Sequence, residues 1–163
     1  MNSRAVIRQN IELARWCCDA YLADLSDGDL MVRPAAGCNH INWQLGHLIT
    51  SDHDLINAVA PGSMPELPSG FGAKYSKATA AIDDASNFCT KEELLNTASI
   101  QLKSALAALQ TATDEDLDDP APAPINSYAP NVAAVFSLLG SHWMMHSGQW
   151  VVVRRLLGKP VLF

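Results

Sequence analysis

The sequence predicts an all-α fold: a four-helix bundle with long crossover connections, in one domain over residues 1–163. Four segments repeat apolar residues at spacings of three and four, the period of an amphipathic helix, and no segment has a clear β-strand pattern. Two connections rich in proline separate the last three helices. A chain of this length can bury one apolar core without disulfides, so a single bundle is the economical architecture.

The first predicted helix covers residues 3–24, with apolar side chains along one face and charged ones on the other. The second begins near residue 39 or 40 and ends at the Pro61–Gly62 break. Residues 61–79 follow, rich in proline, glycine and serine and too long for a tight helical hairpin. We expect this segment to form a crossover or a lid over a site.

The third predicted helix begins after Thr90, which can form a capping box with Glu93, and continues to residue 112. Residues 113–130 come next and are acidic and rich in proline. We interpret them as a solvated connection rather than an acidic binding surface.

The fourth predicted helix takes Asn131 as its N-cap and ends at Gly158. Arg154 and Arg155 lie in its last turns, where positive charge favours the helix dipole. The apolar residues of the first helix and of the tail, residues 151–163, exceed what one bundle core needs. We therefore expect a homodimer.

Composition and charge exclude several classes of function. The formal net charge is −6 and there is no run of Lys or Arg, so no nucleic-acid partner is expected. No segment has the roughly 18–20 consecutive apolar residues of a membrane span, and the N-terminus lacks a signal-peptide pattern. A cytoplasmic protein without membrane contact is expected. The cysteines show no CxxC spacing and are expected to stay reduced: Cys17, Cys18, Cys38 and Cys89.

Two histidines interrupt the apolar face of the fourth helix. His142 and His146 lie about 6 Å apart along the helix axis and about 40° apart around it, so their ring nitrogens can converge on one ion. Such a pair also arises by chance on exposed helix faces. His47, among apolar residues of the second helix, supplies a third imidazole. Burying three neutral imidazoles without partners costs about 1–3 kcal/mol each, whereas one divalent ion satisfies all three, which favours a metal site.

The ligand type narrows the choice of metal only partly. All-imidazole ligation suits zinc or nickel above all, and also iron or copper. Three protein ligands leave room for water or substrate, which is typical of a reactive site rather than a structural one. Because free imidazole has a pKa of about 6.5, we expect protons to displace the metal below about pH 6.

Three other polar residues of the second helix are less informative. His40 is expected either to cap the start of this helix or to contact solvent, and His53 is expected to be exposed. Asp54 lies on the ligand-bearing face and is either a neighbour of the site or a surface residue.

Four further residues near the histidines have two interpretations each. Asn42 and Gln149 are either hydrogen-bond partners of the metal ligands or ordinary contacts between helices. Trp43 and Trp143 are either core residues or walls of a pocket.

Two motifs together carry a family resemblance. The pattern W-x-L-G-H-L covers residues 43–48, and H-x-x-x-H-x-G-Q covers residues 142–149, followed by an arginine and a glycine. With the helix order and the long second connection, the chain resembles the DinB-like (DinB/YfiT) superfamily of small four-helix metal-binding proteins over nearly its whole length. The resemblance implies that His47, His142 and His146 bind a divalent metal. That family includes thiol-dependent transferases and isomerases, which use low-molecular-weight thiols, and many members of unknown activity.

Two functional hypotheses follow. In the first, the protein is a metal-dependent enzyme that activates a low-molecular-weight thiol or water for transfer to a small electrophilic substrate. In the second, it is a non-catalytic metal-containing helical scaffold that acts through dimerisation or partner binding. No glutamate lies beside a candidate ligand as in HExxH, which weakens a hydrolase and favours thiol chemistry.

Overall fold

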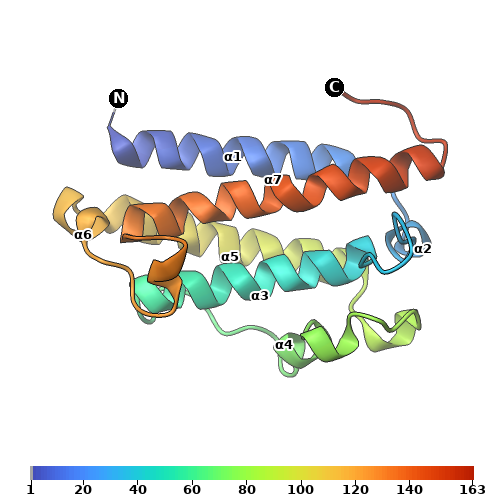
Figure 1. Ribbon diagram of the computed structural model, residues 1–163, viewed down its shortest axis with the longest axis horizontal. Helices are drawn as coiled ribbons and strands as arrows, with labels where there is room; N and C mark the ends of the chain where they lie inside the picture. The colour runs from blue at the N-terminus through green and yellow to red at the C-terminus, as the bar shows by residue number, and fades with distance from the viewer. Residues whose placement is uncertain (1) are drawn as a thin grey trace.

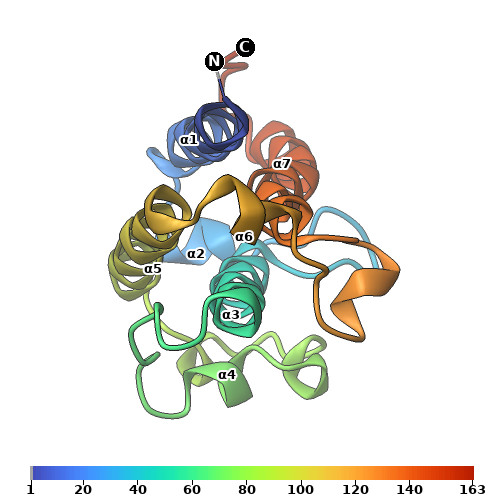
Figure 2. The same cartoon turned by 90° about the vertical axis from the view of Figure 1, so that its left-hand side faces the viewer.

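Four long helices run side by side in the computed structural model, which describes residues 2–163 (Figure 1). They are α1 (Ser3–Leu22), α3 (Ile41–Val59), α5 (Lys91–Thr111) and α7 (Val132–Leu156). Seen along the bundle, α1 lies beside α7, while α3 packs against both α5 and α7 (Figure 2). The described residues contain no β-strand beyond one isolated bridge, between Pro120 and Asn131. The predicted all-α bundle is confirmed.

The N-terminal ends of the helices are set by side chains that satisfy free backbone groups. Thr90 and Glu93 form the predicted capping box of α5. Asn131 caps α7, its side chain accepting a hydrogen bond from the backbone N–H of Ala134 at 2.9 Å. The first helix ends two residues earlier than predicted, at Leu22.

The first long connection is a packed crossover. It contains α4 (Phe71–Lys74) and the short 3₁₀ helices η1 (Lys77–Thr79) and η2 (Ala85–Asn87). It lies along α3 on the side away from α1 (Figure 2). Its aromatic side chains are buried in the same core cluster as α3: Phe71, Tyr75 and Phe88. The crossover that we expected is therefore present, and it covers one face of the helix that carries His47.

The second long connection is solvated only in part. It contains α6 (Asp114–Asp118) and η3 (Ile125–Ser127). A separate short helix, α2 (Asp27–Leu30), lies in the connection between α1 and α3. The acidic residues of α6 are exposed, as predicted. Three apolar residues of this connection are buried against the bundle: Leu117, Ala121 and Ala129.

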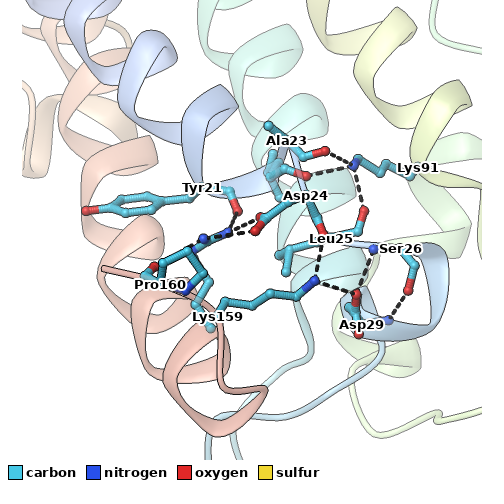
Figure 3. A network of polar contacts seen from close by, with 11 residues as sticks. Tyr21, Ala23, Asp24, Leu25, Ser26, Asp29, Lys91, Lys159 and Pro160 are labelled. Atoms are coloured by element: carbon cyan, nitrogen blue, oxygen red, sulfur yellow. Dashed lines mark hydrogen bonds and ion pairs between the residues drawn. The ribbon is translucent and has the colours of Figure 1, made fainter. Parts of the chain in front are cut away.

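A polar network joins the ends of three long helices (Figure 3). Arg154, which is buried near the end of α7, donates to the carbonyl oxygen of Tyr21 at 2.8 Å and pairs with Asp24. Hydrogen bonding from Arg154 lowers the pKa of Asp24. The ammonium of Lys91, at the start of α5, donates to three carbonyl oxygens at the end of α1: those of Leu22, Ala23 and Leu25. Arg154 thus ties α7 to the end of α1, beyond the dipole interaction that the sequence predicts.

All four cysteine side chains are at least partly buried. All four cysteines are free; Cys18 is buried and the other three are half-buried. Within residues 2–163, no helix combines the length and apolar character that crossing a bilayer requires.

Gly46 allows the crossover to pack closely on α3. A Cβ atom at this position would lie 2.1–2.4 Å from carbon atoms of the Tyr75 ring. Tyr75 is buried, and its hydroxyl oxygen accepts a hydrogen bond from the backbone N–H of Cys89 at 2.8 Å. The ring therefore has little room to move. Gly148, on the exposed side of α7, has no atom within 4 Å of the equivalent Cβ position.

We predict opposite effects for alanine at these two glycines. Gly46→Ala should destabilise the metal-free protein by about 1–3 kcal/mol because the crossover must shift away from α3. Gly148→Ala, the matched control, should stabilise it by about 0.5–1 kcal/mol because alanine has the higher helix propensity. Urea denaturation followed by circular dichroism measures both values. A stability gain in both variants would contradict the close packing of Tyr75 on Gly46.

Candidate metal centre

Three imidazoles converge between α3 and α7. His47 comes from α3, and His142 and His146 come from successive turns of α7. One ring nitrogen of each lies within 4.8 Å of the others, and the Nε2 atoms of His142 and His146 are 3.2 Å apart. All three side chains are half-buried. The structure thus brings together the three residues that the sequence singled out.

The spacing of these nitrogens fits a metal ion. Zinc–nitrogen bonds are about 2.0–2.1 Å, so two ligands at the corners of a tetrahedron lie about 3.3 Å apart. The Nε2 atoms of His142 and His146 are separated by almost this distance. The group could hold a divalent ion, and three protein ligands leave a coordination position for another molecule.

Gln44 orients His146. Its Oε1 atom lies 3.1 Å from His146 Nδ1 and accepts a second hydrogen bond from Trp150 Nε1 at 2.9 Å. Its amide nitrogen donates to the carbonyl oxygen of Asn39 at 2.6 Å and to Gln149 Oε1 at 3.0 Å. Because Oε1 can only accept, His146 carries its proton on Nδ1, which leaves the Nε2 lone pair directed at the other imidazoles.

Trp43 supports the ring of His47. The two rings are stacked, with centroids 5.1 Å apart and an angle of 8° between their planes. Trp43 Nε1 donates to the carbonyl oxygen of Ser76 at 3.2 Å and to Thr79 Oγ1 at 3.1 Å. Both acceptors belong to the crossover. The first long connection therefore positions a ring that packs against a candidate metal ligand.

Burial keeps the three imidazoles neutral. Burial, with a smaller contribution from the nearby His47, lowers the pKa of His142 to about 4. Burial likewise lowers the pKa of His146 to about 4, with smaller contributions from His142 and His47. The pKa of His47 is lowered by burial and then by the charge of Lys77. At neutral pH all three rings have a lone pair that a metal can use.

The remaining acid and histidine candidates lie outside this group. Of the two roles expected for His40, capping is confirmed and solvent contact is wrong, because the side chain is buried. Its Nδ1 atom accepts from the backbone N–H of Trp43 at 3.0 Å, and its Nε2 donates to the carbonyl oxygen of Ile82 at 3.1 Å. The prediction that His53 is exposed is wrong, because His53 is half-buried and hydrogen-bonded to Gln101 at 3.2 Å. Asp54 is exposed and is not part of the histidine group.

The structure resolves the four residues that had two interpretations. Gln149 accepts from Gln44 and so supports the partner of His146. Asn42 donates to the carbonyl oxygen of Cys89 at 2.8 Å, which is an ordinary contact between elements. Trp43 stacks on a candidate ligand, as described above. Trp143 is a buried core residue.

Two polar residues of α3 were missed by the sequence interpretation, Gln44 and Asp52. Asp52 is buried and accepts a hydrogen bond from Trp143 Nε1 at 2.7 Å, while its other carboxyl oxygen has no partner among the described residues. Burial raises the pKa of Asp52 to about 7. The Arg15 guanidinium lies 4.0 Å from the centre of the Trp143 ring. The sequence contained a signal for Asp52: it lies seven residues after Leu45 and therefore on the apolar face of α3.

Comparison with known protein families assigns the chain to one of them. Residues 11–150 match the family model described as the DinB superfamily. No curated protein matches the chain significantly. The matched range includes Gln44 and all three histidines of the candidate metal centre. The resemblance predicted from the two motifs is confirmed, and the chain belongs to the DinB superfamily.

Proposed function

We propose that this protein is a metal-dependent enzyme that activates a low-molecular-weight thiol for transfer to a small electrophilic substrate. The observation that carries the proposal is the convergence of three neutral imidazoles on one point, with a coordination position left for an outside ligand. A divalent ion bound there, zinc or nickel above all, supplies a Lewis acid that favours the thiolate form of a thiol. The reducing cytoplasm that we expect for this chain would keep such a thiol free.

The surroundings of the site support thiol chemistry over hydrolysis. A metal hydrolase commonly needs a carboxylate or another base within reach of the attacking water. The charge that lowers the pKa of His47 comes from Lys77, and the one buried carboxylate of α3, Asp52, is hydrogen-bonded to Trp143 in the core. A cation near the site favours hydroxide and thiolate alike, but a thiol has a lower pKa than water and so depends less on a nearby base. Within this proposal His47, His142 and His146 hold the ion, and Gln44 keeps His146 in the tautomer that can do so.

The second candidate function is a metal-containing scaffold that acts as a homodimer. One observation favours self-association: Trp16 on α1 and Phe163 of the tail are both largely exposed, and their ring centroids lie 5.0 Å apart. Leu13 and Leu156 add further exposed apolar area on α1 and α7. The tail runs back from the end of α7 toward α1 (Figure 1). Exposed apolar side chains on neighbouring elements are typical of an interface.

We predict that thiols stabilise the protein only when metal is bound. Cysteine or glutathione at about ten times its Kd should raise the Tm of zinc-loaded protein by about 3–5 °C. S-methylcysteine and S-methylglutathione, which cannot form a thiolate, serve as matched controls and should give no shift. Thermal unfolding of metal-loaded and metal-free samples measures this. An equal shift with the S-methyl compounds, or a thiol shift without metal, would refute the thiol proposal.

Another prediction concerns the pH dependence of metal binding. Because burial lowers the pKa of His142 and His146 to about 4, protons compete with the metal at lower pH than the sequence suggested. Metal affinity should fall less than about tenfold between pH 7 and 5.5, and most of the loss should come below about pH 4.5. Three imidazoles with the free pKa of about 6.5 would lose roughly 500-fold over the first interval. Calorimetric zinc titrations at pH 7 and 5.5 measure this loss of affinity. A loss of several hundredfold would contradict the burial of the imidazoles.

The third prediction tests the dimer. The wild-type chain of 17.6 kDa should show twice this mass by light scattering at micromolar concentration. Trp16→Asp should shift the equilibrium to monomer because it places a charge in the apolar contact. Ile100→Asp, at an exposed apolar residue of α5, is the matched control and should remain dimeric. A monomeric wild type would exclude the homodimer.

A further inference from the structure

A cavity of about 330 Å³ lies next to the histidine group, between α3 and α7. Ser51 and Leu55 of α3 line one side. Leu138, Ser141, His142 and Met145 of α7 line the other, and Tyr128 of the second long connection completes the wall. This volume lies at the lower end of the range of about 300–1,000 Å³ that is typical of small-molecule sites.

The lining is apolar and carries no charge. No Lys, Arg, Asp or Glu is among the residues that line the cavity. The hydroxyl of Ser141 donates to the carbonyl oxygen of Ser137 at 3.2 Å, so it is already satisfied by its own helix. Tyr128 and Met145 are largely exposed, which leaves an aromatic ring and a flexible thioether at the surface beside the cavity. A charged group placed here would lose water without gaining an ionic partner.

His142 joins the cavity to the candidate metal centre. The same residue supplies a ring nitrogen to the histidine group and lines the cavity. A molecule whose reactive atom is held at the centre therefore has an apolar space beside it. We propose that this cavity binds an uncharged apolar arm, aromatic or short branched alkyl, of the electrophilic substrate. The inference rests on the proposed function, since it takes the histidine group as the place of reaction.

Hydroxamates of different size test this subsite, because the hydroxamate group binds zinc whatever arm it carries. We would measure the Kd of acetohydroxamate, benzohydroxamate and 4-carboxybenzohydroxamate for zinc-loaded protein by calorimetry. Benzohydroxamate should bind at least about tenfold more tightly than acetohydroxamate because its ring is buried in the cavity. The added carboxylate should remove this gain.

Two tryptophan variants test whether the cavity is the source of the tighter binding of benzohydroxamate. Ser141→Trp fills the cavity from an exposed position of α7 and should bring the ratio of the acetohydroxamate Kd to the benzohydroxamate Kd to about one. Met144→Trp adds the same side chain at a neighbouring exposed residue outside the cavity lining and should keep the preference. Circular dichroism and zinc analysis would check that both variants are folded and loaded.

The outcomes separate the subsite from the proposed function. If acetohydroxamate binds but benzohydroxamate binds no better, or if both tryptophan variants keep the preference, the subsite is overturned and the open metal centre stands. If zinc-loaded protein binds neither hydroxamate, the open coordination position fails and the subsite fails with it. Preference for the carboxylated compound would overturn the uncharged class of substrate.

Discussion

The hydrogen bonds of the Gln44 amide are the interaction on which the candidate site depends. The oxygen accepts from His146 and Trp150 of α7, while the nitrogen donates to Gln149 and to the backbone just before α3. An amide has one acceptor oxygen and two N–H groups, so only one orientation of this side chain satisfies all four contacts. The register of α3 against α7 and the tautomer of His146 are therefore fixed together.

Burial of the imidazoles connects the fold to the chemistry. The crossover packs on Gly46 and holds Trp43 against the ring of His47, while α7 supplies His142 and His146 from the other side. This packing removes water from the rings and lowers the pKa of each. Neutral, half-buried imidazoles are costly to leave without partners, and one divalent ion satisfies three of them at once. The burial that keeps the imidazoles unprotonated is thus also the feature that favours metal binding.

Local pattern predicted the four long helices, the N-caps Thr90 and Asn131, and the pair His142 and His146, because each of these depends on spacing within one segment. His47 was added from its apolar surroundings and from the family resemblance. Contacts between segments were not predictable in the same way. Gln44 lies on the core side of α3, but its role depends on the register against α7. His53 was expected to be exposed because it lies about 120° around the helix from His47, and the contact that it makes with Gln101 of α5 could not be read from the spacing within α3. The partner of Asp52, Trp143, likewise comes from another helix.

Elemental analysis of the purified chain tests the central claim, that three histidines from two helices form one metal site. Wild-type protein and the control His53→Ala, which changes a histidine of α3 outside the group, should each retain about one divalent ion per chain after dialysis. His47→Ala should retain far less than one while keeping its helix content, because the bundle is stabilised mainly by its apolar core. Full retention by His47→Ala would show that α3 contributes no ligand and would contradict the account.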